Sequence, residues 1–254
     1  ELRAFSPFAP PDDEASGYPI AVLRYRLRNS GTRPLSASVC GTLPNFVGMD
    51  GWDLVRDWKG DWQPRGASRN RNVFWTAAGV SGLFMDSKGV DPDSEQWGSL
   101  ALVVSGANSV THRLNWTEPQ WGGALLDFWD DFSADGRLDP RPPNRDDAPV
   151  GSLAAALRLA PGESREITFL IAWHFPNRYA WNTPENKRTA QDRVGNYYTS
   201  RVADAWAAAT EAAGRLNQLE ERTKTFVRDF CTSALPGVVK EAALFNLSTF
   251  VTQT

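Results

Sequence analysis

The sequence predicts a mainly β protein, an antiparallel β-sandwich followed by a C-terminal helical region. Apolar and polar residues alternate in short runs over the first two thirds of the chain, turn residues separate these runs, and the pattern becomes helical after about residue 195. Helices do not alternate with the strands, as they would in a βαβ fold. At 254 residues the chain can bury an ordinary core. We expect a β-sandwich domain at 1–195. We expect residues 196–254 to form a helical linker and the first helix that leads into a further domain.

The first strands are expected to form a hairpin with one solvated face. Leu23, Tyr25 and Leu27 alternate with three arginines, and a turn at 29–31 leads into a second alternating run at 35–39. Further strands are expected at 72–86, 99–105, 110–116, 153–160 and 165–173, with long loops at 43–70 and 117–150. Loops of this length usually carry a function or an interface.

The last strand ends in a bend that is rich in aromatic and polar side chains, within ITFLIAWHFPNRYAW at 167–181. Ile167 and Phe169 fall on one face of the strand, and Leu170 interrupts the other, so we expect both faces to be covered. Residues 152–173 are interpreted as a second hairpin. Because strand-end loops often hold binding residues, the bend supplies candidates for a substrate rim or a domain interface. These candidates are Trp173, His174, Asn177, Arg178 and Trp181. For His174, a packing role and a functional role are equally favoured.

An acidic cluster adds Asp130 and Asp131 to the rim or interface candidates. Asp127 and Asp131 would share a face only in a helix, whereas Gly136 and the residues after it predict a solvated loop. The same run resembles part of a calcium loop, but its twelfth position is a proline where a bidentate Glu is required. We therefore expect no metal site. His112, on the apolar face of a predicted strand, is expected to be a core histidine.

Composition excludes several classes of protein. The net charge is −3 and the arginines are scattered, so the chain lacks the basic face of a nucleic-acid-binding protein. No stretch is long and apolar enough to predict a transmembrane segment. The two cysteines, Cys40 and Cys231, are expected to be free thiols in a reducing, cytoplasmic compartment. Because the chain starts at Glu1 rather than Met, we expect its true N-terminus to be missing, and export stays open.

Tryptophan is unusually abundant, with 11 residues, and six of them lie in or directly beside the two long predicted loops. Flat aromatic faces suit the stacking of sugar rings, but tryptophans in long loops also anchor those loops by burying apolar area. Both interpretations stay open. The loop tryptophans are Trp52, Trp58, Trp62, Trp116, Trp121 and Trp129.

Two helices are expected after the sandwich. Apolar or small residues recur at helical spacing over 202–230, and a second helix is expected to start near 233–236, because Pro236 suits a first helical turn, and to run to 254. The second helix is apolar on most of its surface. We therefore expect a longer protein, of which this chain is the N-terminal part.

Four segments resemble one known family: SPFAPPDDEASGYPIAVLRYRLRN at 6–29, AWHFPNRYAW at 172–181, GNYYTSRVADAW at 195–206 and LPGVVKEAALFNLSTFVTQT at 235–254. Together they resemble the N-terminal region of glycoside hydrolase family 116, the β-glucosidases that include the non-lysosomal glucosylceramidase. The resemblance implies a supersandwich-like N-terminal domain, a helical linker and a helical-toroid catalytic domain. It also implies that the nucleophilic Glu and the acid/base Asp lie downstream, so no residue of this chain is expected to be catalytic.

The expected function is therefore that of a non-catalytic N-terminal domain of a retaining β-glucosidase or glucosylceramidase. Its partner would be the downstream catalytic domain, its loops would reach the substrate-pocket rim, and the full-length enzyme would take a β-glucoside or glucosylceramide without a cofactor. The alternative is a self-standing carbohydrate-binding or scaffold module.

Overall fold

The computed structural model describes residues 1–49, 66–77, 79–117, 123–142, 147–180, 182, 184 and 187–247, and the backbone of 54–56 and 62–64. The strands are β1 (Leu2–Phe5), β2 (Ile20–Arg28), β3 (Leu35–Pro44), β4 (Leu54–Arg56), β5 (Trp62–Pro64), β6 (Asn70–Ala77), β7 (Val80–Ser87), β8 (Ser99–Ser105), β9 (Ser109–Arg113), β10 (Val150–Leu159) and β11 (Ser164–His174). The helices are α1 (Asp13–Ser16), α2 (Ala124–Asp135), the 3-10 helices η2 (Ala190–Asp192) and η3 (Tyr197–Ser200), α3 (Ala205–Thr232) and α4 (Gly237–Asn246).

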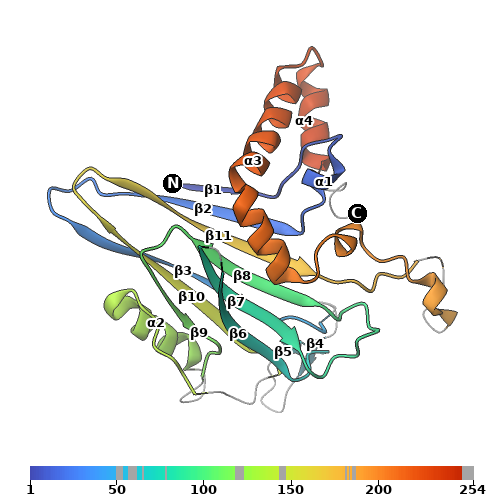
Figure 1. The fold of residues 1–254 in the computed structure, drawn as a ribbon, viewed down its shortest axis with the longest axis horizontal. Helices are drawn as coiled ribbons and strands as arrows, with labels where there is room; N and C mark the ends of the chain where they lie inside the picture. The colour runs from blue at the N-terminus through green and yellow to red at the C-terminus, as the bar shows by residue number, and fades with distance from the viewer. Residues whose placement is uncertain are drawn as a thin grey trace.

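Two antiparallel sheets face each other and form the predicted sandwich (Figure 1). The larger sheet has the strand order β1-β2-β11-β8-β7-β6, and the smaller has β3-β10-β9. Between them lies a core of fully buried residues that includes Leu83 and Leu100 of the larger sheet and Leu153 of the smaller. The sheets approach closely at Gly41, where an added Cβ would lie 3.1 Å from the ring of Phe169. The apolar alternation of the sequence therefore marks the faces that meet in this core.

Both predicted hairpins are wrong, because each pair of consecutive strands divides between the two sheets. β2 pairs with β1 and β11, whereas β3 pairs with β10. β10 likewise pairs with β3 and β9, not with β11. The two crossing connections lie together, since Asn29 N–H donates to Glu163 O and Gly162 N–H donates to Asn29 O, both at 2.9 Å. The turn residues therefore predict correctly where these strands end. After each turn, however, the chain passes to the opposite sheet instead of pairing with the strand before it.

The strand expected at 72–86 is two strands, β6 and β7, which pair with each other. Gly79, at φ 83°, takes part in the turn between them, a conformation that glycine adopts without steric cost. β9 ends at Arg113, three residues before the end of the expected strand. The predicted loop at 43–70 contains the short pair β4 and β5.

The outer face of the larger sheet is covered by α3, as expected for a strand that is apolar on both sides (Figure 1). Leu170 and Ala172 of β11 share a buried cluster with Ala208, Ala209 and Ala212 of α3. Alanine adds little bulk and has high helix propensity, so this stripe brings the helix close to the sheet. Asp204 caps α3 by accepting a 2.8 Å hydrogen bond from Ala207 N–H. Residues on both sides of position 195 thus share one core, and the division at that position stays a prediction.

The expected loop at 117–150 is wrong over α2, a helix of 12 residues. Gly136 follows the helix at φ 75° and its N–H donates to Phe132 O, so this glycine is the left-handed C-cap of a helix. The helix lies on the outer face of the smaller sheet, on the other side of the sandwich from α3 (Figure 1). The molecule therefore stacks a helix, two sheets and a second helix.

α4 follows Pro236 and runs back beside the end of α3 (Figure 1). Lys240 Nζ donates to the carbonyl oxygens of Cys231 and Ser233 at 2.8 and 3.2 Å, which satisfies groups at the end of α3. The second predicted helix is thus confirmed up to Asn246, and residues 248–254 lie outside the described part. No helix within that part is long and apolar enough to cross a membrane.

Candidate functional site

The bend after β11 places its predicted site residues in different surroundings. His174 is buried, with its Nε2 3.0 Å from Val202 O and its ring in edge contact with Tyr198. Burial lowers the pKa of His174, so the ring is neutral near pH 7. These contacts favour the packing role over the functional role for His174.

Asn177 holds the bend against a neighbouring loop. Its buried side-chain amide donates to the carbonyl oxygens of Pro92 and Ser94, and its Oδ1 accepts a 3.2 Å hydrogen bond from Arg193. Arg178 is exposed, and its backbone oxygen accepts hydrogen bonds from residues 194 and 195. Trp181 lies outside the described residues. The Asn177 amide and these backbone hydrogen bonds therefore help to hold the bend in place.

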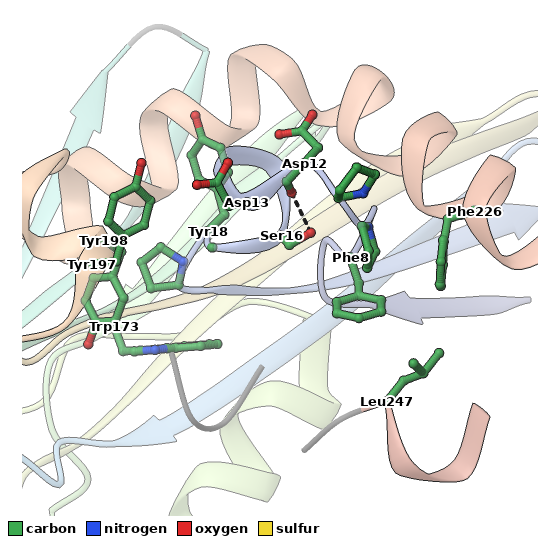
Figure 2. Close-up of a pocket in the computed structure, with 14 residues that line it drawn as sticks. Phe8, Asp12, Asp13, Ser16, Tyr18, Trp173, Tyr197, Tyr198, Phe226 and Leu247 are labelled. Atoms are coloured by element: carbon green, nitrogen blue, oxygen red, sulfur yellow. Dashed lines mark hydrogen bonds between the residues drawn. The ribbon is translucent and has the colours of Figure 1, made fainter. Parts of the chain in front are cut away.

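Trp173 opens onto a pocket of about 620 Å³ between the N-terminal segment, the bend and the helices (Figure 2). Residues 8–19 form one wall, and the backbone joins them to the bend because Trp173 N–H donates to Pro19 O at 3.1 Å. The lining residues are Phe8, Pro10, Pro11, Asp12, Asp13, Ser16, Gly17, Tyr18, Pro19, Trp173, Tyr197, Tyr198, Phe226 and Leu247. Sequence reasoning did not identify this pocket as a site. The available signal was the mixture of prolines, aromatics and acidic residues at 6–18, just before the second strand.

Six aromatic rings line the pocket, and they come from four segments of the chain. Phe8 and Phe226 meet edge to face with centroids 5.4 Å apart. Tyr18 is buried, and its hydroxyl donates to Glu211 and accepts a 2.7 Å hydrogen bond from Arg215 on α3. Burial raises the pKa of Tyr18, so the phenol remains protonated. The aromatic wall is therefore tied to α3 by a hydrogen-bond network.

Most polar groups of the lining already have partners. Ser16 Oγ donates to Asp12 O at 2.7 Å and accepts from Ala9 N–H at 2.9 Å. The Asp12 carboxylate accepts from Ala15 N–H and pairs with Arg222. Asp13 is exposed, in the first turn of α1. The pocket is thus apolar inside, with carboxylates at its border.

The acidic cluster on α2 lies on the other side of the sandwich and does not join this pocket (Figure 1). Arg113, which is fully buried, donates to Asp127 at 2.7 Å and to Asp131 at 2.6 Å. Arg141 also donates to Asp127, and these hydrogen bonds hold the pKa of Asp127 below its usual value. Asp130 is exposed. The two aspartates thus share a helix face and fasten α2 to the sheet, contrary to the predicted loop.

His112 and Cys40 are half-buried and have packing roles, whereas Cys231 is exposed. His112 stacks on Phe74 with centroids 3.9 Å apart, and burial lowers its pKa. Cys40 and Cys231 are free, and burial raises the pKa of Cys40 to about 11, which makes its thiol unreactive. Among the described residues, no group of three His, Cys, Asp or Glu side chains could hold a metal ion.

Of the loop tryptophans whose side chains are described, Trp116 supports loop anchoring. Trp116 stacks on Phe128 and donates a 2.8 Å hydrogen bond to Ser152. Trp129 is instead 58% exposed on α2. The predicted residues Trp52, Trp58 and Trp121, and the side chain of Trp62, lie outside the described part.

Comparison with known proteins identifies the family. A family described as "beta-glucosidase 2, glycosyl-hydrolase family 116 N-term" matches residues 1–219. A solved structure, a putative kojibiose phosphorylase from human microbiome, is 11% identical with a TM-score of 0.28, over 82% of this chain and 21% of that chain. This chain therefore spans about a fifth of the length of that structure. No curated protein matches. Since the match covers most of the sequence, the chain belongs to glycoside hydrolase family 116, as its N-terminal domain.

Proposed function

We propose that this chain is the non-catalytic N-terminal domain of a retaining β-glucosidase or glucosylceramidase and packs on the catalytic domain of the same protein. The family match over residues 1–219 carries this proposal. The catalytic domain would follow α4, and the full-length enzyme would act on a β-glucoside without a cofactor. The free Cys40 and Cys231 are consistent with a cytoplasmic location.

The chemistry of the carboxylates supports a non-catalytic role. A retaining glycosidase needs two carboxyl groups about 5–5.5 Å apart, one of them with a raised pKa that lets it act as an acid. Asp127 and Asp131 share a helix face, but Arg113 and Arg141 bind them, and the pKa of Asp127 is lowered. Asp127 is therefore held as an anion and is unsuited to protonate a leaving group.

Exposed apolar side chains on α4 support a docking role. Val238 is 73% exposed and Phe245 is 77% exposed, and both lie beyond the family match. Large apolar residues gathered on a surface commonly mark a protein interface. We place the catalytic domain against α4 and the end of α3, with the bend at Trp173 and Arg178 facing the substrate-pocket rim.

Two exposed apolar residues provide a matched test in the full-length enzyme. Phe245→Asp should weaken domain docking, lowering the melting temperature and the turnover of an aryl β-glucoside. Leu126→Asp on α2, where the side chain is 65% exposed, should change neither quantity. The reverse result would place the catalytic domain against α2 instead.

A second experiment tests the assignment of activity. The 254-residue chain alone should not hydrolyse an aryl β-glucoside above background, because the proposed catalytic carboxylates lie outside it. Robust turnover that is lost in Asp130→Ala or Asp131→Ala would overturn the proposal. Tight binding of glucosides by the isolated chain, with no effect of Phe245→Asp in the longer protein, would favour the self-standing carbohydrate-binding module.

A further inference from the structure

We propose that the pocket between Tyr18, Trp173 and Phe226 binds a small molecule with an aryl or alkyl group that is neutral or cationic. Here this cavity is called the aromatic pocket, with the 14 lining residues given above (Figure 2). The inference concerns a ligand of this domain itself and is tested on the 254-residue chain, without the catalytic domain that we propose to pack against α4.

The size and the support of the pocket suit a small ligand. Its volume of about 620 Å³ lies within the range of ordinary small-molecule sites. Its walls are held from several directions: Tyr18 OH bonds to Glu211 and Arg215, while Tyr198 OH accepts from Phe175 N–H at 3.2 Å. The buried Tyr18 ring and the half-buried Tyr198 ring are therefore positioned before any ligand arrives, which reduces the entropy cost of binding.

The hydrogen bonds of Ser16 and Asp12 favour an apolar ligand over a sugar in this pocket. A sugar ring carries several hydroxyls, and each needs a hydrogen-bond partner when it leaves water. The side-chain oxygen of Ser16 already accepts a hydrogen bond from Ala9 N–H. The Asp12 carboxylate accepts one from Ala15 N–H and pairs with Arg222. The rings of Phe8, Trp173 and Phe226 can instead pack against hydrocarbon or aromatic surface. An apolar group therefore gains binding free energy from contact with these rings, whereas a polyol would lose hydrogen bonds to water that the lining does not replace.

The charged residues at the border of the aromatic pocket distinguish between apolar ligands whose head groups differ in charge. Asp12 and Asp13 are the charged residues of the lining, and both are acidic. The nearby cations have partners, since Arg222 pairs with Asp12, and Arg201 lies 3.7 Å from the Glu14 carboxylate. An anionic head group would thus meet carboxylates with no arginine in the lining to receive it. Neutral and cationic amphiphiles should bind, and anionic ones should bind more weakly.

The test uses N-phenyl-1-naphthylamine, a neutral dye that becomes fluorescent in apolar surroundings, with the 254-residue chain. We expect saturable binding, and displacement by dodecanol and dodecylamine at least about tenfold better than by dodecanoate, below their micelle concentrations. Tyr197→Ala removes an exposed aromatic wall and should weaken dye binding about tenfold. Asp13→Lys, at an exposed position, should abolish the discrimination against dodecanoate.

Two controls separate the pocket from other apolar surface. Trp129→Ala on α2 and Val238→Asp at the start of α4 remove exposed apolar groups elsewhere and should leave dye affinity unchanged. Circular dichroism of every variant checks the fold. Dye binding that is non-saturable, dye binding that Tyr197→Ala leaves unchanged, discrimination against dodecanoate that persists in Asp13→Lys, or dye binding that is lost with Val238→Asp would each overturn the inference. None of these results bears on whether Phe245→Asp weakens domain docking, so the two proposals can fail separately.

Discussion

The guanidinium of Arg113 donates a 2.6 Å hydrogen bond to the carboxylate of Asp131. Arg113 belongs to β9 and is completely buried, whereas Asp131 lies on α2. Asp127, one turn earlier on the helix, accepts a second hydrogen bond from the same guanidinium at 2.7 Å. These contacts fix one face of α2 against the smaller sheet.

Arg113→Met should therefore destabilise the protein by about 3 kcal/mol, because removal of one partner of a buried ion pair leaves the other uncompensated. We expect the lower end of the usual range, since Arg141 would still pair with Asp127. Urea unfolding followed by circular dichroism measures the change. Asp130→Ala, on the same helix but exposed, should change the free energy of unfolding by no more than about 0.5 kcal/mol. Equal effects of the two substitutions would contradict the role of the pair.

The two histidines should make stability depend on pH. Burial lowers the pKa of both His112 and His174 in the folded protein. The unfolded chain, with histidine pKa values near 6.5, therefore binds protons first as the pH falls. The free energy of unfolding should decrease as the pH falls below about 6.5, and this decrease should end once the pH is below the folded values. Urea unfolding at a series of pH values between about 7 and 5 measures this slope.

Substitution of the histidines tests the cause. The chain has 2 histidines, so a variant with His112→Gln and His174→Gln should lose most of the slope above pH 5, even if it is less stable at every pH. Each single variant should keep part of this pH dependence of the free energy of unfolding. An unchanged slope in the double variant would assign the pH dependence to other groups.

Arg178→Ala tests the proposed rim in the full-length enzyme. The backbone oxygen of residue 178 accepts hydrogen bonds from residues 194 and 195, and the substitution retains this oxygen, so these hydrogen bonds of the bend should be kept. If the bend faces the catalytic domain, glucoside turnover or domain docking should decrease. Asn177→Ala is the structural comparison, because it removes hydrogen bonds to Pro92 and Ser94 and should lower the melting temperature. Unaltered turnover and an unaltered melting temperature in Arg178→Ala would contradict the hypothesis that the bend faces the substrate-pocket rim.

The 254-residue chain should self-associate through α4. Val238, Val239 and Phe245 are exposed there, and Leu235 and Val227 add exposed apolar area nearby. Sedimentation velocity should show concentration-dependent oligomers, and a variant with Val238→Asp and Phe245→Asp should be monomeric. A matched control variant with Leu125→Asp and Leu126→Asp on α2 should still form the oligomers. Oligomers that persist in the α4 variant would instead point to another surface.

The sequence by itself determined the kinds of elements and the faces that they bury. Period-2 alternation at Leu23, Tyr25 and Leu27 and at Ile167 and Phe169 identified strands whose apolar sides meet in the sandwich core. Helical spacing after residue 195 identified α3 and α4. These patterns are local, because the side-chain direction repeats every two residues in a strand and every 3.6 in a helix. The family resemblance is confirmed by the match over residues 1–219, which contains the segments at 6–29, 172–181 and 195–206 but not the one at 235–254.

Only the tertiary structure decided which strands pair and which residues share a site. Alternation fixes the buried face of a strand but not its neighbour, so β2 and β3 could look like a hairpin while lying in different sheets. Gly136 and the residues after it predicted a loop, whereas in the structure this segment forms α2, and Arg113 of β9 pairs with its two aspartates Asp127 and Asp131. Of the predicted rim residues, Trp173 alone of those described lines the aromatic pocket, and its other walls come from residues 8–19, 197–198, 226 and 247. Such a site depends on contacts between segments as far apart in the sequence as Phe8 and Phe226, and no local pattern encodes them.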